Sequence, residues 1–227
     1  MHSDLSQKFS SGSFLLVRKV DDSVVFLGTA FLVHEEGYLL TAAHLIGNES
    51  DDLLVAPAKD PDEFSALSLD QVAALAVTTV AVDRVHNVAL LRFVRNIQVD
   101  APDHLLGSID NVSLGDSVLG FGFPFGHQDL HNLAVQRGMV SSKASLGNGT
   151  RLLLVDCMIH DGMSGGPLVA VQDGRAVGIL VGRFTPDDEG GDFARGTDHP
   201  DYHTAFSYAV SIEYGIRLLE DQGVEIN

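Results

Sequence analysis

Apolar residues occur in short runs along most of the chain, separated by glycine, proline, asparagine and aspartate. Short apolar runs between turn-forming residues are typical of the strands of a β-barrel or β-sandwich. The first two runs, at 13–20 and 24–27, flank Asp21-Asp22-Ser23 and predict a hairpin. Further strands are predicted at 28–34, 38–43, 53–57, 75–82 and 88–94, and then at 116–122, 133–141, 151–159, 167–172, 175–184 and 203–210.

A helical pattern is recognised only near the C-terminal end. From Ser211 onward, Ile212, Ile216 and Leu219 recur near helical spacing, with Ser211 as the expected N-cap and Gly223 as the expected stop. Two series of about six strands followed by one helix favour an all-β fold of two packed six-stranded β-barrels with a C-terminal helix.

The polar stretch near the middle of the chain predicts the boundary between the two barrels. The N-terminal barrel is expected within residues 1–100 and the C-terminal barrel with its helix within 101–227. Residues 185–201 are rich in Asp, Glu, Gly and Pro and are expected to form an exposed loop.

Charge and cysteine content narrow the function classes. The 227 residues include 31 acidic and 14 basic side chains, a formal charge of −17 that repels phosphate backbones and anionic lipids. Nucleic-acid and membrane partners are therefore not expected, and no apolar run is long enough to span a bilayer. The N-terminus lacks the apolar stretch of a secretory signal, and the single Cys157 fits a reducing compartment, so a cytoplasmic location is predicted.

The segment Gly162-Met163-Ser164-Gly165-Gly166-Pro167 carries the clearest chemical signal. A nucleophilic serine needs an exposed hydroxyl next to backbone N–H groups that can hold a developing oxyanion. Glycines on both sides allow the sharp turn that brings these groups forward. Ser164 is therefore the candidate nucleophile, and the N–H groups of Gly162 and Ser164 are the candidate oxyanion hole. A purely structural glycine turn is the alternative interpretation.

A histidine motif complements this serine. Thr41-Ala42-Ala43-His44 follows an apolar run and places His44 at the end of a predicted strand. A neutral imidazole can accept the serine proton and return it to the leaving amine. His44 alone would more often be structural, but together with the Ser164 segment it is the candidate general base.

These motifs resemble the chymotrypsin/trypsin clan of serine peptidases, and within it the protease domain of the HtrA/Deg proteases. The resemblance extends over nearly the whole chain. It covers Gly28–Val33, Thr41–His44, Asn87–Leu91, Gly120–Gly126, Gln136–Ser141, Gly162–Pro167 and Ala205–Val210. It implies a double β-barrel with the site in the cleft between the barrels, a polypeptide substrate, an acyl-enzyme on Ser164 and no cofactor.

The chain departs from the family pattern at the third triad position. The family has an aspartate before the apolar Ala-Leu-Leu run, whereas this chain has Asn87. An aspartate accepts a hydrogen bond from the histidine Nδ1–H and stabilises the imidazolium, which a neutral amide does less well. Asn87 is compatible with a slow or induced protease, with an inactivating replacement, or with a peptide-binding module that has lost catalysis. Asp83, four residues earlier, is not expected to take its place.

By resemblance, the residue six positions before the nucleophile, Met158, forms the base of the pocket for the P1 side chain of the substrate. Val181, Gly182 and Arg183 would form its walls. An apolar base favours an apolar P1 residue over Lys or Arg. Arg183 leaves two alternatives open, because it could occlude the pocket or bind an acidic group.

No metal site is predicted. The pairs His127/His131 and His199/His203 have a spacing of four residues but no third ligand at motif spacing. No PDZ-like segment follows the predicted helix, and further domains or partner proteins outside this chain remain an open alternative.

Overall fold

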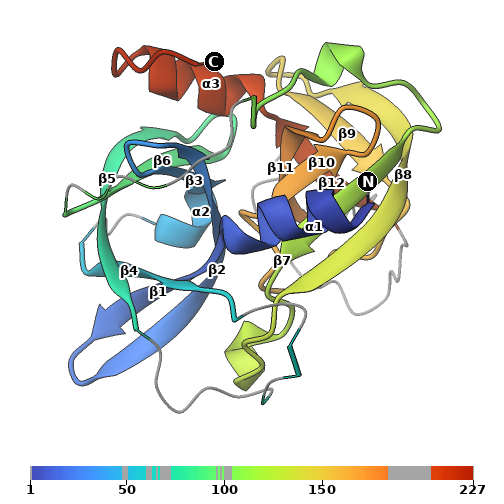
Figure 1. The fold of residues 1–227 in the computed structure, drawn as a ribbon. Coiled ribbons are helices and arrows are strands. Elements are labelled where there is room, and N and C mark those ends of the chain that lie inside the picture. Colours follow the sequence, from blue (N-terminus) through green and yellow to red (C-terminus); the bar gives the residue numbers. More distant parts are fainter. Residues whose placement is uncertain are drawn as a thin grey trace.

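The computed structural model describes residues 2–47, 51–59, 63–64, 66, 73–95, 97, 99, 104–183 and 206–226. Along them, the strands form two closed antiparallel barrels, ordered β1-β2-β3-β6-β5-β4 and β10-β11-β12-β9-β8-β7 (Figure 1). A short helix follows the last strand. The predicted all-β fold of two six-stranded barrels with a C-terminal helix is confirmed.

The first barrel contains β1 (Ser13–Val20), β2 (Ser23–His34), β3 (Tyr38–Ala42), β4 (Leu53–Pro57), β5 (Leu75–Asp83) and β6 (Val88–Phe93). The second contains β7 (Ser117–Gly122), β8 (Ala134–Ser145), β9 (Arg151–Val155), β10 (Pro167–Ala170), β11 (Arg175–Arg183) and β12 (Ser207–Ser211). The helices are α1 (His2–Ser11), α2 (Ala43–Ile46) and α3 (Glu213–Glu220), with 3-10 turns η1 (Ile109–Asn111) and η2 (Gly126–Gln128). The loop predicted at 185–201 lies outside the described residues.

The first hairpin forms where it was predicted, but its second strand, β2, is longer than expected. Asp21 takes a left-handed conformation in the turn, and Val20 pairs with Ser23. The two strands expected at 24–27 and 28–34 are one strand, β2, because Gly28 does not break the chain. A Cβ at Gly28 would lie 2.9 Å from the carbonyl oxygen of Ser164, so this glycine permits a close approach of the Ser164 loop to the first barrel.

The helices differ from the sequence prediction in two respects. α1 was not predicted, although Leu5 and Phe9 are four residues apart on one helix face. The Phe9 ring lies 5.7 Å from the ring of Phe121 on β7, so α1 packs against the second barrel. At the C-terminal end, the N-cap of α3 is Ile212 and no side chain caps it, whereas Ser211 still belongs to β12. The Ser211 hydroxyl donates to the Glu213 carboxylate instead of accepting from a backbone N–H of the helix.

The barrels are joined by a continuous apolar core. Phe31 and Leu40 of the first barrel belong to the same buried cluster as Phe121 and Val181 of the second. α3 follows the second barrel in sequence but packs against β5 and β6 of the first (Figure 1). This packing fixes the two barrels relative to each other and therefore fixes the groups that face the cleft. No helix in the described part of the chain is long and apolar enough to cross a membrane.

Candidate active site

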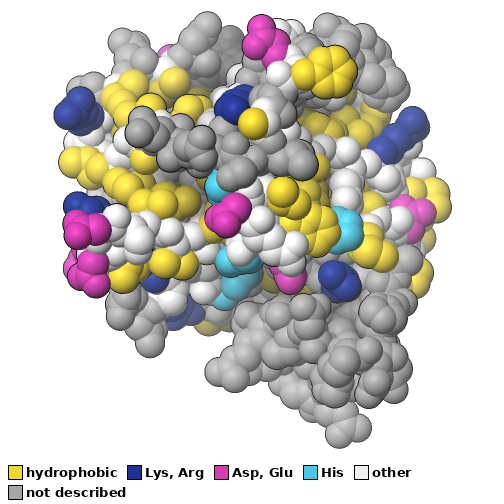
Figure 2. Space-filling model, turned by 90° about the horizontal axis from the view of Figure 1, so that it is seen from below, with side chains coloured by type: hydrophobic (Ala, Val, Ile, Leu, Met, Phe, Trp, Pro, Cys, Tyr) yellow, Lys and Arg dark blue, Asp and Glu magenta, His cyan; other side chains and the backbone are white. Residues whose placement is uncertain are grey.

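A cavity of about 230 Å³ lies between the two barrels. Leu27, His44 and Leu45 line it from the first barrel, and Ser164, His127 and the segments 159–162 and 181–183 line it from the second. Figure 2 shows one face of the molecule on which histidine and hydrophobic side chains lie next to each other near the centre. Both predicted catalytic side chains, His44 and Ser164, therefore face the same space.

His44 is positioned by the junction of β3 and α2. The strand ends at Ala42, and the helix that begins at Ala43 turns the His44 side chain toward the cleft. The backbone N–H of Ala43 donates to the carbonyl oxygen of Asn87 at 3.1 Å. β3 also pairs with β6 up to Ala42–Val88, so the residue before Val88 must lie beside His44.

Asn87 lies against the imidazole of His44, in the turn before β6. Its Oδ1 accepts a hydrogen bond from the backbone N–H of His44 at 2.9 Å and lies 3.2 Å from His44 Nδ1. Its Nδ2 lies 3.0 Å from the same Nδ1. Asn87 is 7% exposed and has a left-handed φ of 60°, a conformation that asparagine tolerates better than most residues.

This geometry is compatible with both neutral tautomers of His44. With the proton on Nδ1, the ring donates to Oδ1 of Asn87, and Nε2 is free to accept a proton. With the proton on Nε2, Nδ1 accepts from Nδ2 of Asn87, and the ring cannot act as a base at Nε2. A carboxylate would select the first arrangement, because it has no N–H to donate.

Burial lowers the pKa of His44 below its ordinary value, and the hydrogen bond with Asn87 opposes this shift. Among the described residues, no carboxylate forms a hydrogen bond with His44. Asp83 accepts from the N–H of His86 at 3.0 Å and contacts its Nδ1 at 2.5 Å. Asp83 is thus occupied by a different histidine.

The Ser164 loop is built on glycine and anchored to the first barrel. Gly162 and Gly165 have φ values of 96° and 87°, and a Cβ at either would overlap a backbone oxygen. The Thr29 hydroxyl donates to the carbonyl oxygen of Gly162 at 2.7 Å, and the Thr29 N–H donates to that of Ser164 at 2.9 Å. The sequence signal for this role of Thr29 is its position next to Gly28, but sequence reasoning assigned it none.

The peptide between Asp161 and Gly162 is oriented by the loop after β7. The N–H of Phe125 donates to the carbonyl oxygen of Asp161 at 2.8 Å. In a trans peptide the C=O and the following N–H point in opposite directions, so the N–H of Gly162 points away from Phe125. Among the described residues, the N–H groups of Gly162 and Ser164 have no hydrogen-bond acceptor.

The Ser164 hydroxyl donates its hydrogen bond to a backbone carbonyl in this structure and not to His44. Its Oγ donates to the carbonyl oxygen of Val181 on β11 at 2.5 Å. Because a serine side chain has three staggered rotamers, a rotation about χ1 redirects the hydroxyl.

Three of the four residues predicted for the P1 pocket line the cavity, and the fourth does not. Val181, Gly182 and Arg183 line the cavity, whereas Met158 is 42% exposed and is not among the lining residues. Ile159, which is 2% exposed, lines the cavity instead. The chain after β9 therefore directs Ile159, the neighbour of Met158, toward the cavity, and the place of Met158 at the pocket base stays a prediction.

Further cavity residues were missed by sequence reasoning. His160 lies beside the ring of Phe125, with 4.8 Å between ring centroids, and His127 makes an edge contact with Phe26 at 4.9 Å. Burial and the nearby Arg183 charge lower the pKa of His160, while Asp161 opposes this shift. The only available signal was the proximity of His160 to Ser164 in the sequence.

The part of the chain that the structure describes contains neither a metal-binding cluster nor a reactive thiol. No group of three or more His, Cys, Asp or Glu residues there could hold a metal ion. His199 and His203 lie outside the described residues. Cys157 is 6% exposed, and burial raises its pKa to about 11, so its thiol is not a second nucleophile.

The fold is that of a chymotrypsin-like peptidase: two closed barrels face one cavity, the first with His44 and the second with Ser164 in a glycine-rich loop. The family model of the trypsin-like peptidase domain matches residues 28–179. The chain belongs to this family.

Several known proteins are similar to the chain. A probable periplasmic serine endoprotease, DegP-like, of Pseudomonas fulva is 34% identical over 162 residues, which are 70% of this chain and 29% of that protein. The magnetosome formation protease MamE of Magnetospirillum gryphiswaldense is 31% identical over 169 residues, covering 72% and 20%. The chain thus spans less than a third of the length of these relatives.

A solved structure of the HtrA-type protease AlgW with a tripeptide has the same fold. Its TM-score is 0.69 at 21% identity, over 97% of this chain and 63% of that one. The resemblance to HtrA-type protease domains that the sequence predicted is confirmed. The Pseudomonas relative is named as periplasmic, so the comparisons lend no support to the predicted cytoplasmic location.

Proposed function

We propose that this domain is a serine endopeptidase that hydrolyses peptide bonds through an acyl-enzyme. The Ser164 Oγ bonds to the carbonyl carbon of the substrate while His44 Nε2 takes its proton. The N–H groups of Gly162 and Ser164 hold the oxyanion. His44 then protonates the leaving amine, and water releases the acyl group by the reverse sequence. The observation that carries the proposal is the His44–Asn87 contact facing Ser164 across one cleft.

Two features distinguish this site from one arranged for attack, and the first of them makes the proposed enzyme slow. Asn87 holds His44 without favouring the productive tautomer, and Ser164 must leave the carbonyl oxygen of Val181 before it can donate to His44. The first feature persists throughout turnover. The second requires one side-chain rotation, which is fast compared with ordinary enzymatic turnover.

The same two features favour a second candidate function, a catalytically silent module that binds peptides in this cleft. A fluorophosphonate probe separates the two functions, because it labels an activated serine covalently. Labelling that is lost in Ser164→Ala supports the peptidase. A chain that binds peptide but never labels, even after Asn87→Asp, supports the silent module.

The pocket is proposed to prefer an apolar P1 side chain over Lys or Arg. The buried Ile159 and Val181 offer apolar walls, and the guanidinium of Arg183 repels a basic P1 group. In a peptide-library digest, most cuts are expected after apolar residues and few after Lys or Arg. Arg183→Glu should increase the share of cuts after Lys and Arg by about tenfold.

Met158→Glu is the control for this specificity, since it introduces the same carboxylate side chain one residue outside the cavity lining. It is expected to leave the P1 preference unchanged. If Met158→Glu rather than Arg183→Glu admits basic P1 residues, Met158 forms the pocket base and Ile159 does not.

The acid limb of the pH–rate profile is expected below the ordinary histidine range. His44 acts as a base only when neutral, and burial lowers its pKa, so kcat/KM should fall only as the pH drops through that lowered value. Asn87→Asp should move this limb to higher pH, because a carboxylate stabilises the imidazolium. The profile of kcat/KM on one peptide, measured for both forms, tests the shift. An acid limb at the same pH in both forms would argue against His44 as the titrating base.

The setting of the domain in the cell is likewise a proposal. The lone buried Cys157 supports a reducing, cytoplasmic location. Cell fractionation followed by immunodetection tests it, and recovery in an extracytoplasmic fraction would contradict it. The physiological substrate of the whole protein is a polypeptide on this proposal, and its identity depends on residues beyond the cleft.

A further inference from the structure

The residue before Asn87 is stacked on a tyrosine from the other end of the chain. The rings of His86 and Tyr214 are nearly parallel, with 3.8 Å between centroids and 11° between planes. His86 belongs to the turn that connects β5 to β6, and Tyr214 belongs to the first turn of α3. The stack therefore joins the turn that presents Asn87 to a helix that follows the second barrel.

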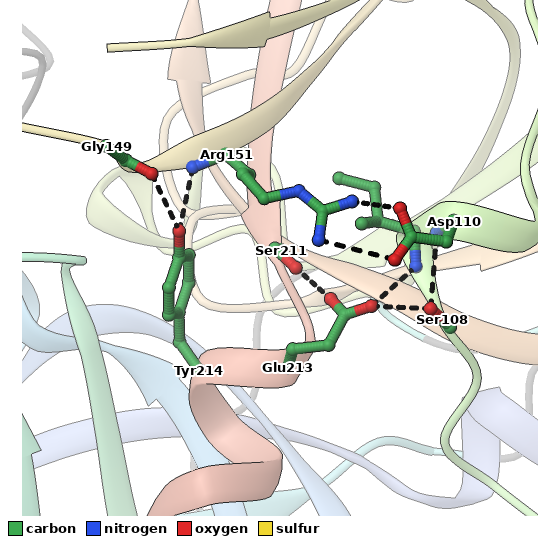
Figure 3. Close-up of polar contacts among 8 residues, drawn as sticks. Ser108, Asp110, Gly149, Arg151, Ser211, Glu213 and Tyr214 are labelled. Carbon is green, nitrogen blue, oxygen red and sulfur yellow. Dashed lines mark hydrogen bonds and ion pairs between the residues drawn. The ribbon is translucent and has the colours of Figure 1, made fainter. Parts of the chain in front are cut away.

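The Tyr214 ring is held from the second barrel at its hydroxyl. Its oxygen accepts a hydrogen bond from the N–H of Arg151 at 2.8 Å and lies 3.5 Å from the carbonyl oxygen of Gly149 (Figure 3). Tyr214 is 5% exposed, so the ring is packed on its sides as well. Arg151 begins β9, which makes the hydroxyl contact a link to the barrel itself.

The neighbouring Glu213 fixes the start of the same helix. Its carboxylate accepts hydrogen bonds from the Ser108 hydroxyl at 2.6 Å, from the N–H of Ile109 at 3.0 Å, and from the Ser211 hydroxyl. Three donors from segments that follow the first barrel in sequence thus hold this carboxylate (Figure 3). A displacement of α3, and of Tyr214 with it, would break these hydrogen bonds.

The turn on the other side of the stack is held by polar contacts within the first barrel. Asp83 binds both the N–H and the Nδ1 of His86, and Arg84 donates to the carbonyl oxygen of Gly47 at 2.7 Å. Asn87 itself is in a left-handed conformation, which most residues adopt only at an energetic cost. The stack on Tyr214 adds to these contacts one that comes from outside the first barrel.

We propose that Tyr214 is a positioning residue. Its ring supports His86 and so fixes the Asn87 amide against His44, which makes the geometry of the catalytic base on the first barrel depend on the second barrel. The inference rests on the proposed function, in which Asn87 orients the base. The stack preserves two contacts of Asn87 Oδ1, one with His44 N at 2.9 Å and one with His44 Nδ1 at 3.2 Å.

Tyr214→Leu is expected to lower kcat by about 10- to 100-fold with KM little changed, since a misplacement of about 1 Å in a catalytic group costs about this much. Leucine keeps the site apolar but removes the flat ring on which His86 stacks. Tyr214→Phe keeps the ring and loses only the hydroxyl contacts, so it should retain kcat within about threefold. Rates are expressed per active site titrated with a fluorophosphonate, which removes any unfolded fraction from the comparison.

Tyr38→Leu is the matched control. Tyr38 is also 5% exposed and also contacts a histidine ring, that of His34, but it begins β3 at the end opposite His44. Tyr38→Leu should lower the melting temperature about as much as Tyr214→Leu does, but it should leave kcat per active site unchanged. If Tyr38→Leu and Tyr214→Leu reduce kcat equally, the effect is general loss of packing and the proposal is wrong.

A double-mutant cycle tests the route through Asn87. In an Asn87→Ala background, Tyr214→Leu should change kcat by less than about twofold, because the group that it positions is absent. The same loss in both backgrounds would overturn the proposal.

The ¹⁵N shifts of the His44 ring provide a readout that does not need turnover. They should change in Tyr214→Leu and remain unchanged in Tyr38→Leu and Tyr214→Phe. Unchanged shifts in Tyr214→Leu would refute the positioning role. If the shifts change but no form labels with fluorophosphonate, the positioning holds and the proposed peptidase function fails.

Discussion

Replacing Asn87 with aspartate is expected to raise kcat by about 10² to 10⁴. The side chain already lies between the backbone N–H and the Nδ1 of His44, so the replacement puts a carboxylate where the structure holds an amide. The carboxylate has no N–H to offer Nδ1 and therefore selects the tautomer with a free Nε2. It also stabilises the imidazolium formed during attack. Together these effects correspond to about 3 to 5 kcal/mol of activation free energy.

The measurement is turnover of one peptide by both forms from about pH 6 to about pH 10. The advantage of the aspartate form should narrow at higher pH, where removal of the serine proton needs less help. Asn148→Asp is the matched control, because Asn148 accepts a hydrogen bond from Thr150 in a turn of the second barrel and does not line the cavity. It should leave kcat unchanged. Equal rates for the Asn87 chain and the Asn87→Asp variant at every pH would mean that position 87 does not orient the base.

The sequence was sufficient for the residues whose roles depend on local backbone chemistry. Glycines around Ser164 and an apolar strand before His44 are local signals, and the structure brings both side chains to one cavity. The role of Asn87 followed from the family resemblance, in which the third triad residue precedes this apolar strand, and in the structure β6 pairs with β3 in a register that sets Asn87 beside His44. Turn chemistry and the end of an apolar strand are local features, which is why the sequence alone indicated Ser164 and His44.

Other features depend on packing between distant segments, and the sequence carried no local sign of them. Met158 and Ile159 are adjacent and both apolar, and only the turn after β9 decides which of them faces the cavity. His86 stacks on Tyr214, and nothing near His86 in the sequence indicates this partner. The rotamer of Ser164 depends on the position of the Val181 carbonyl on β11, a strand of the same barrel.

Ser164→Ala is expected to abolish covalent labelling and reduce cleavage to a floor set by substrate binding and the oxyanion hole. The size of the loss should depend on residue 87. In a complete triad, removal of the serine costs about 10⁶ in kcat, whereas removal after the acid has already been lost costs only about 10² more. The chain with Asn87 should therefore lose about 10², and the Asn87→Asp form should lose about 10⁴ to 10⁶, since its kcat is higher by the gain given above and both fall to one floor.

The reason is that nucleophile and base act as one unit, so the reaction that remains without Ser164 uses neither His44 nor residue 87. His44→Ala should reach the same floor, and the double variant should fall no further. The decisive comparison is Ser164→Ala with Asn87 against Ser164→Ala with aspartate at 87, which should cleave at one common rate. Pretreatment with fluorophosphonate identifies contaminating peptidase, since it cannot inhibit a chain without Ser164. A residual rate that resists this treatment and still rises with aspartate at 87 would mean that the base activates a different nucleophile, and Ser164 would lose its proposed role.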